Sequence, residues 1–221
     1  NLRRLGGVPL VTWALRSGLM SSSIDTVILT SDDEEICQLG YEESGVIVQK
    51  RPKDLADDSA STLSVLQHVL REITISHGKP KGIVLLEPTS PFRHANLIDS
   101  CAEKFLLLNT RTVVTVVAVE RNPRNIFTTD GDLATYFIQE PMISFHRRQE
   151  FAHLKRINGC VYIYSADSIE SGIPISEPIR YIEMQQEFSV NIDSHIDLDL
   201  AGIVYEHTDV DGGPFRHITD R

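Results

Sequence analysis

The feature that most constrains the fold is a repeated alternation of short apolar runs with longer segments of helical period. Runs rich in β-branched residues predict strands at 25–30, 45–50, 82–87 and 111–119. Apolar residues recur at helical spacing over 9–19, 60–76 and 95–108. The strands are continuous apolar runs, which is typical of a parallel sheet covered by helices on both faces. We therefore predict a doubly wound α/β fold with a largely parallel sheet.

A segment at about 122–155 interrupts this pattern with turn signals, short mixed runs and a basic stretch. We expect it to be a small insertion that acts as a lid or dimer arm within a single domain spanning 1–221. Regular structure then resumes, with strands predicted at 159–165 and 179–184 and a final helix at about 196–205.

Charge and cysteine content restrict the partners and the compartment. The formal net charge of -10 at pH 7 repels nucleic acid and anionic membranes, and no apolar run is long enough to span a bilayer. An anionic ligand would therefore need local basic residues or a metal ion. Cys37, Cys101 and Cys160 are odd in number and widely separated, which indicates neither a disulfide framework nor a zinc site and fits a reducing cytoplasm.

Polar residues follow two of the predicted strands, at the edge where doubly wound sheets bind ligands. In TSDDEEI, Ser31 has capping-box spacing to Glu34, and Asp32 would lie near a ligand. In RPKDLADDSAST, Arg51 precedes a helix start that could bind an anion or a polar base edge. The simpler alternatives are a surface charge at Arg51 and helix caps at Ser31 and at Asp58 or Ser59.

The stretch LLEPTSPFR, residues 85–93, ends a predicted strand on a rigid loop. Pro88 and Pro91 fix φ and remove two amide donors, so the backbone after Glu87 stays extended. Glu87, Thr89 and Ser90 would then present polar groups at a fixed place on the ligand edge. The alternative is a rigid connector in which Ser90 or Arg93 makes only local bonds.

Two further stretches carry candidate ligand groups. The basic run HRRQEFAHLKR, residues 146–156, precedes an Asn-Gly turn, so Arg156 and Asn158 could point back toward the cleft and bind carboxylates or phosphates. In SVNIDSHIDLDL, Asn191 and Asp193 lie on one face of an apparent strand, where two oxygen ligands could hold Mg²⁺ together with substrate phosphates. A solvated charged face and a helix capped by Asp193 or Ser194 are the simpler alternatives.

In order and spacing, these segments resemble the CMP-sialic acid synthetase family, which includes the legionaminic and pseudaminic acid cytidylyltransferases. The resemblance covers nearly the whole chain: NLRRLGGVPLVTWAL, TVILTSDDEEI, RPKDLADDSAST, LLEPTSPFR, INGCVYIY and SVNIDSHIDLDL. It implies a Rossmann-like nucleotidyltransferase fold, Mg²⁺ as cofactor, and transfer of CMP from CTP to a nonulosonic acid with release of pyrophosphate. It also implies a role in cell-surface glycan synthesis, such as lipopolysaccharide or capsule, and a cytoplasmic homodimer.

The resemblance also implies roles for particular residues. The nucleotide would be held by Asn1, Arg51, Thr62 and Glu87, and the sugar acid by Glu87, Arg148, Arg156, Asn158 and Tyr162. Asn191 and Asp193 would occupy the catalytic metal positions.

The chain departs from the family pattern in three ways. We expect a strand and a Gly-rich phosphate loop to precede residue 1 in the full gene product. Glu87 stands where the family has glutamine, and Asn191 replaces one of two metal carboxylates, which should weaken Mg²⁺ binding. The alternative function is therefore a non-catalytic descendant that binds nucleotide or sugar. An oxidoreductase is disfavoured because no Gly-x-Gly-x-x-Gly follows a predicted strand.

Overall fold

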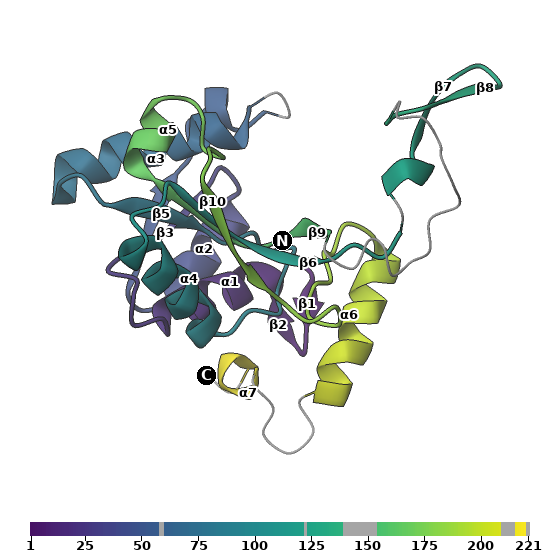
Figure 1. Cartoon of the computed structure of the whole chain (residues 1–221). Coiled ribbons are helices and arrows are strands. Elements are labelled where there is room, and N and C mark those ends of the chain that lie inside the picture. The colour runs from purple at the N-terminus through teal and green to yellow at the C-terminus, as the bar shows by residue number, and fades with distance from the viewer. Residues whose placement is uncertain (58–59, 122, 139–153, 209–214, 220–221) are drawn as a thin grey trace.

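The structure, a computed structural model, describes residues 1–57, 60–121, 123–138, 154–208 and 215–219. Figure 1 shows strands and helices gathered in one body, with a hairpin projecting from it. The strands are β1 Arg4–Leu5, β2 Val8–Pro9, β3 Val27–Ser31, β4 Val46–Lys50, β5 Gly82–Leu85, β6 Thr112–Ala118, β7 Phe127–Asp130, β8 Leu133–Tyr136, β9 Lys155–Ser165 and β10 Ile179–Glu183. The helices are α1 Leu10–Leu19, α2 Glu34–Glu42, α3 Thr62–His77, α4 Ala95–Leu107, α5 Ala166–Glu170, α6 His195–Thr208 and α7 Arg216–Thr219, with short 3₁₀ turns η1 Lys53–Leu55 and η2 Pro123–Asn125.

The α/β fold class is confirmed, but the main sheet is mixed rather than largely parallel as predicted. Its strand order is β10-β6-β9-β5, with β10 parallel to β6 and β9 antiparallel to both β6 and β5. Strands β3 and β4 pair in parallel as a separate two-stranded sheet. The chain leaves β6 at Ala118 and enters β9 at Lys155 directly opposite, so β9 returns antiparallel as the second strand of a hairpin does.

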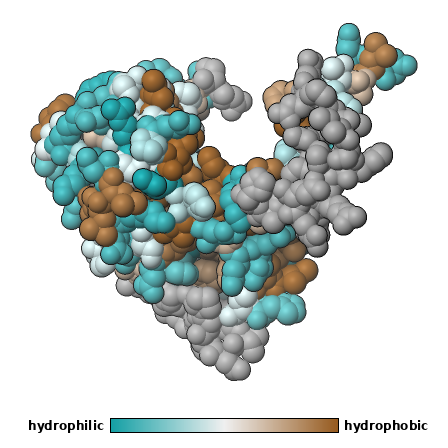
Figure 2. Space-filling model, viewed as in Figure 1, coloured by the Kyte–Doolittle hydropathy of each residue, from teal (hydrophilic) through white to brown (hydrophobic). Residues whose placement is uncertain are grey.

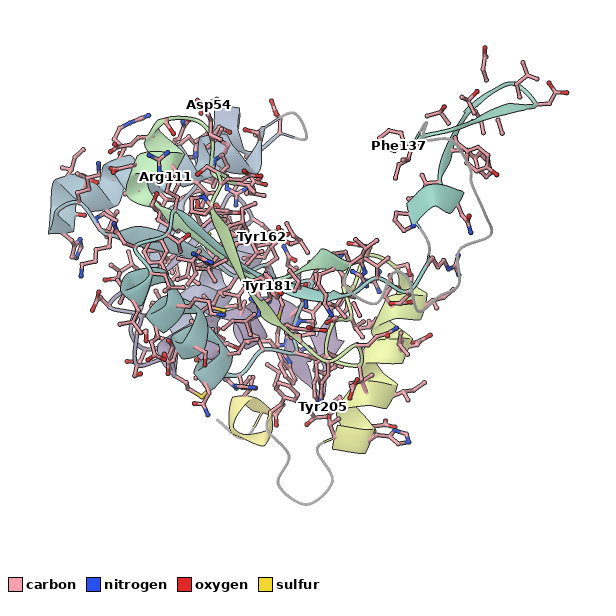
Figure 3. The ribbon with its side chains drawn as sticks, in the orientation of Figure 1. Asp54, Arg111, Phe137, Tyr162, Tyr181 and Tyr205 are labelled. Atoms are coloured by element: carbon pink, nitrogen blue, oxygen red, sulfur yellow. The ribbon has the colours of Figure 1, made fainter. Side chains whose placement is uncertain are left out.

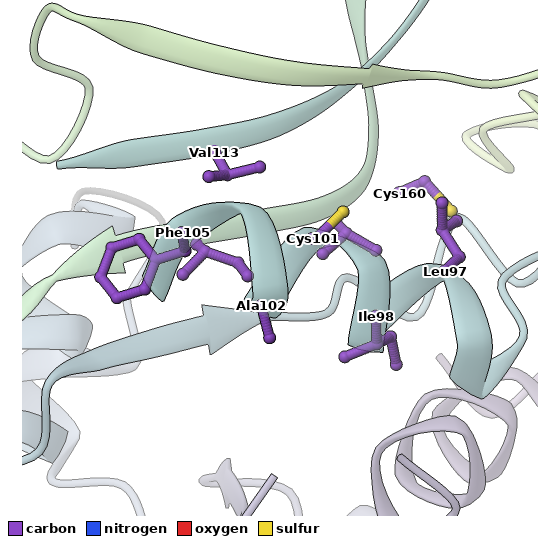
Figure 4. Close-up of a cluster of buried hydrophobic side chains, with 9 residues drawn as sticks. Leu97, Ile98, Cys101, Ala102, Phe105, Val113 and Cys160 are labelled. Atoms are coloured by element: carbon purple, nitrogen blue, oxygen red, sulfur yellow. The ribbon is translucent and has the colours of Figure 1, made fainter. Parts of the chain in front are cut away.

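Helices cover both faces of the main sheet, as the continuous apolar runs predicted. On one face, α4 packs Leu97, Ile98, Cys101, Ala102 and Phe105 against Val113 of β6 and Cys160 of β9 (Figure 4). On the other face, α3 and α5 pack against Ile83, Leu85 and Tyr164. Side chains alternate along β9, so Ile163 faces α4 while Tyr162 and Tyr164 face α3.

A second core supports the loop after β5. Trp13 of α1 is fully buried, and its indole Nε1 donates a hydrogen bond to the carbonyl of Leu5 at 3.0 Å. Its ring contacts Phe92 edge-on at a centroid distance of 6.3 Å, and Phe215 lies 5.4 Å from Phe92. Phe92, in the loop after β5, is therefore held in place by its packing against Trp13 and Phe215.

Two predicted helix caps differ from the structure. Helix α2 is capped by Asp33, whose Oδ1 accepts from the amides of Glu35 and Ile36, because Ser31 is still paired in β3. Helix α3 is capped by Ser61, whose Oγ accepts from the amide of Ser64 at 3.1 Å. The predicted alternatives Asp58 and Ser59 lie outside the described residues.

The predicted insertion at 122–155 is described only in part, because residues 122 and 139–153 lie outside the described residues. Its described portion includes the antiparallel hairpin β7–β8, which projects away from the body in Figure 1. The lid or dimer-arm role of this segment stays a prediction.

All three cysteines of the sequence lie within the described residues. Cys37, Cys101 and Cys160 are buried and unpaired, and burial raises the pKa of the Cys101 thiol to about 12. Within the described part of the chain, every helix is too short or too polar to cross a membrane.

Candidate functional site

The candidate site lies where the carboxyl ends of β5 and β6 meet residues 156–162 of β9. Because β9 is antiparallel, Tyr162 pairs with Leu85 at the end of β5, and Arg156 pairs with Val117 near the end of β6. Figure 2 shows this face hollowed between the body and the projecting β7–β8 hairpin. In Figure 3, Tyr162 lies below and between Asp54 on the body and Phe137 beside the hairpin.

Polar groups from two segments, the 87–90 loop and β9, converge on Gly159. A Cβ built there would lie 3.2 Å from Ser90 Oγ, 3.4 Å from Glu87 Oε2 and 3.9 Å from Tyr162 Oη. Gly159 has φ +78° and lies where the pairing of β6 with β9 shifts register, between Val114 and Val116. Such bulges re-aim side chains beside binding sites. Glycine is required here both by its positive φ and by the closeness of these groups.

The segment that carries Asn191 and Asp193 joins this cluster. The amide of Ile192 donates to the carbonyl of Thr89 at 2.7 Å, and Ser90 Oγ donates to Asn191 Oδ1 at 3.2 Å. Asn191 Nδ2 donates to Asp193 Oδ2 at 2.6 Å. The two predicted metal positions and the Pro-Thr-Ser-Pro loop therefore form one hydrogen-bonded chain.

The predicted strand at 191–193 is wrong, although both side chains lie together as expected. The segment is irregular and runs directly into α6. Ser194 begins that helix with reciprocal bonds: its Oγ accepts from the amide of Asp197 at 3.3 Å, and Asp197 Oδ2 accepts from the amide of Ser194 at 2.7 Å. The alternative that Ser194 caps a helix is thus confirmed.

The electrostatics of the site centre on Glu87. Burial raises the pKa of its carboxyl group, the Arg93 guanidinium lowers it, and the Asp193 carboxylate raises it further, with a net upward shift. Burial and the nearby Glu87 carboxylate also raise the pKa of Tyr162. Both shifts favour the neutral form of each group relative to the free side chain, and the Tyr162 hydroxyl can donate a hydrogen bond to a polar ligand.

The residues expected to hold a nucleotide lie at the ends of other elements. The amide of Arg51 donates to the carbonyl of Ser31 at 2.9 Å, and its Nη2 donates to the carbonyl of Thr30 at 2.8 Å, which fixes Arg51 at the carboxyl ends of β3 and β4. Thr62 is the exposed first residue of α3. Asn1 is exposed, and its carbonyl accepts from the amide of Val11 at 3.1 Å.

The residues expected to contact a sugar acid divide into three cases. Arg156 has a half-exposed side chain whose Nη2 lies 3.6 Å from Glu120 Oε1. Tyr162 belongs to the cluster around Gly159. Arg148 lies outside the described residues.

Asn158 does not point toward the cleft as the Asn-Gly pattern suggested. Strand β9 already begins at Lys155, so the Asn-Gly pair lies within the strand rather than in a turn before it. Asn158 is 4% exposed, accepts from Thr115 Oγ1 at 2.6 Å and donates to Ser189 Oγ at 2.9 Å. Its amide therefore holds β6, β9 and the 189–194 segment together, and a contact with sugar stays a prediction.

The oxygen donors of the site suit a cation whose other ligands are substrate phosphates and water. The described residues contain no group of three or more His, Cys, Asp or Glu that could hold a metal ion by themselves. Asp193 is an exposed carboxylate beside the Asn191 amide. Mg²⁺ commonly binds one or two protein oxygens and completes its shell with phosphates and water, so this donor set fits it.

The sequence pattern did not identify Gly159 as a site residue. For Arg93 it predicted only local bonds. Those bonds are present, because Arg93 Nε donates to the carbonyl of Ser90 at 3.0 Å and Nη2 donates to the carbonyls of Glu87 and Ser90. The positive φ of Gly159 could have been suspected from a glycine inside a strand pattern.

Comparison with known proteins shows which sequences and solved structures this chain resembles. The sequence profile described as cytidylyltransferase matches residues 1–202. The chain is 28% identical over 201 residues to N-acylneuraminate cytidylyltransferase A of Danio rerio, covering 91% of this chain and 46% of that protein. It thus spans about half the length of such relatives.

Bacterial relatives are covered more fully. The chain is 25% identical to CMP-N,N'-diacetyllegionaminic acid synthase of Legionella pneumophila, over 91% of this chain and 87% of that protein. It is 22% identical to the pseudaminic acid cytidylyltransferase of Campylobacter jejuni, over 90% and 86%. A solved CMP:2-keto-3-deoxy-manno-octonic acid synthetase in complex with CTP superposes with a TM-score of 0.63 at 17% identity, over 93% of this chain and 91% of that one, which shows a shared fold.

Proposed function

The chain belongs to the cytidylyltransferase family, and from this premise we propose that it transfers CMP from CTP to a nonulosonic, sialic-type acid and releases pyrophosphate. The observation that carries the proposal is the chain of bonds from Ser90 through Asn191 to Asp193 at the edge where the strands end. It supports a site that binds phosphate oxygens and sugar hydroxyls side by side. The named relatives that make CMP derivatives of such acids support the same substrate class.

The residues support a mechanism based on positioning and charge neutralisation. The anomeric hydroxyl of the acid attacks the α-phosphorus of CTP in line, and pyrophosphate leaves from the opposite side. Arg51 provides a fixed cation for the nucleotide phosphates, with Thr62 and Asn1 as further nucleotide contacts. Arg156 and Arg148 provide cations for the sugar carboxylate, while Glu87 and Tyr162 form hydrogen bonds with sugar hydroxyl groups.

Asn191 and Asp193 are the residues that would hold Mg²⁺. When bound, the metal ion supplies a Lewis acid that neutralises developing charge on the phosphate oxygens. Asn191 Nδ2 now faces Asp193, so offering its carbonyl oxygen to a cation requires the amide to turn over. Ser90 permits this change, because its hydroxyl can accept a hydrogen bond from the turned amide as readily as it donates one now.

Release of pyrophosphate tests the proposal. Full-length protein incubated with CTP, Mg²⁺ and sialic, legionaminic or pseudaminic acid should release pyrophosphate with at least one acid. Reactions without acid, and reactions with ATP, GTP or UTP, are the controls and should stay at background. Tight binding of CTP with no turnover on any acid would contradict the proposal.

Gly159→Ala should impair activity through the groups that crowd it. Gly159 and Gly172 both have φ +78°, so alanine at either position should cost about 1 kcal/mol of unfolding free energy through backbone strain. A new Cβ at 159 meets Ser90 and Glu87, whereas one at 172 meets nothing within 4 Å. We expect Gly159→Ala to lower kcat/KM about 10-fold, and Gly172→Ala to leave it unchanged. Equal kinetics in the two variants would exclude this role for the crowding.

We also propose that the β7–β8 hairpin packs against a second copy of the chain. The hairpin and its flanks expose Ile126, Phe127, Leu133, Tyr136 and Phe137, which are between 48% and 70% accessible. Contiguous exposed apolar residues on a projecting element are typical of a subunit contact.

Light scattering of the full-length protein tests this contact. A dimer is expected, and the double variant Phe127→Asp with Leu133→Asp should shift the equilibrium toward monomer. Ile75→Asp, at a position 77% exposed on α3, is the matched control and should leave the dimer intact. A wild-type monomer at working concentration would contradict the proposal.

We further propose a cytoplasmic location, which the free thiols of Cys37, Cys101 and Cys160 support.

A further inference from the structure

One arginine beneath the site is buried more deeply than its chemistry favours. Arg93 is 0% exposed and is the only charged residue among the buried residues of the described chain. Its Nε and Nη2 atoms donate to backbone carbonyls of the 87–90 loop, while Nη1 is buried with no hydrogen-bond partner. Burying a cation without a contacting carboxylate costs free energy. Folding stability alone therefore does not explain why a charged residue occupies position 93.

The hydrogen bonds of Arg93 connect the two ends of the 87–90 loop. The guanidinium bonds to the carbonyl of Glu87 at the start of the loop and to that of Ser90 near its end. The Arg93 amide donates to the carbonyl of Pro91 at 2.7 Å, and its own carbonyl accepts from Ser17 Oγ at 3.1 Å. A planar fork with several donors can hold two carbonyls at once, which the single ammonium group of a lysine does less well.

The same loop carries the polar groups of the site. Glu87 and Ser90 both reach Gly159, and Ser90 donates to Asn191. The carbonyl of Thr89 accepts from the amide of Ile192, which places the segment that carries Asp193. A change in the loop backbone would therefore move groups on both the sugar side and the metal side of the site.

We propose that Arg93 is a positioning residue for the transfer reaction: its buried guanidinium fixes the 87–90 backbone and thereby aims Glu87, Ser90 and the Asn191–Asp193 pair at the substrates. Arg93 touches no substrate in this arrangement and acts through the loop carbonyls. The role of the loop in CMP transfer rests on the proposed function, whereas the fixing of the loop by Arg93 does not.

Thiol labelling tests the fixing of the loop without any assay of turnover. Cys160 lies under the loop, with its Sγ 3.7 Å from the carbonyl oxygen of Phe92 and 4.0 Å from that of Ser90. Cys101 belongs to the same apolar cluster as Cys160 but makes no contact with the loop carbonyls among the described bonds, so it is an internal control. In Arg93→Gln, Cys160 should label at least about 10-fold faster than in wild type, while Cys101 stays protected. Unchanged labelling of Cys160, or equal acceleration at both thiols, would overturn the proposal.

Kinetics test the consequence for the reaction, with Arg16→Gln as the matched control. The Arg16 side chain is also largely buried, bonding Glu43 Oε1 at 2.8 Å and the carbonyl of Ile218 at 2.6 Å, but it lies outside the loop. Arg93→Gln should lower kcat about 30-fold and leave the KM for CTP within about threefold, since it disturbs alignment more than nucleotide binding. Arg93→Lys should recover only a minor part of kcat.

The control separates positioning from general stability. Arg16→Gln should keep kcat even if its melting temperature falls as far as that of Arg93→Gln. Wild-type kcat in Arg93→Gln or Arg93→Lys, or an equal loss of kcat in Arg16→Gln, would overturn the positioning role. Absence of turnover in the wild-type protein would instead refute the proposed function, and the labelling result would still decide whether Arg93 fixes the loop.

Discussion

Asp193→Asn is expected to lower kcat about 1,000-fold, because this carboxylate is the only acid in the bonded pair that we propose to hold the metal. Asn191 already offers an uncharged amide, so the substitution leaves the pair with no negative charge. The shapes of aspartate and asparagine are nearly the same, and Asp193 is exposed, so folding should be little affected. Pyrophosphate release at saturating CTP and acid, over a range of Mg²⁺ concentrations, measures the loss.

Two variants sharpen this test. Asp199→Asn changes an exposed acid on α6 and should leave kcat unchanged. Asn191→Asp adds a second carboxylate and should lower the Mg²⁺ concentration that gives half-maximal activity. If Asp193→Asn retained kcat within about threefold of wild type, the metal assignment would be wrong, since loss of a required charge interaction costs far more.

Arg51→Gln is expected to weaken CTP binding about 100-fold, the size of the loss when a charge-assisted hydrogen bond is removed. The amide and Nη2 of Arg51 bond to the carbonyls of Ser31 and Thr30, which hold the residue at the carboxyl ends of β3 and β4. The bond to Thr30 uses only one hydrogen of Nη2, so the guanidinium retains further donors. Calorimetric titration of CTP into each variant measures the change.

A surface arginine provides the control for this prediction. Arg71 is exposed on α3, and Arg71→Gln makes the same change in charge away from the strand ends. It should bind CTP as wild type does. CTP affinity that was unchanged in Arg51→Gln, or equally reduced in Arg71→Gln, would show that net charge rather than Arg51 governs nucleotide binding.

The sequence predicted the elements well and the direction of one strand poorly. Apolar runs bounded by turn residues identified β3 to β6, β9 and β10, because burial on both faces demands such runs in any sheet. That demand is the same for parallel and antiparallel strands. The antiparallel direction of β9 follows from the path of the connection between Ala118 and Lys155, which local composition does not encode.

In the candidate site, too, some features could be predicted from the sequence and others could not. Glu87, Tyr162, Asn191 and Asp193 were predicted as site residues, and the structure brings them together around Gly159 and Ser90. The expected orientation of Asn158 toward the cleft was wrong because its amide bonds to Thr115 and Ser189, partners that are remote in sequence. Arg93 could not be placed beneath the loop from its neighbours alone, since its burial depends on packing of the tertiary structure.

The most direct test of the account is a crystal structure of the full-length protein with CTP, Mg²⁺ and the preferred sugar acid. The account predicts the triphosphate between Arg51 and the Asn191–Asp193 pair, with the sugar ring against Glu87 and Tyr162. A nucleotide bound away from the ends of β4 and β5, or Arg51 and Asp193 on opposite sides of the molecule, would contradict it.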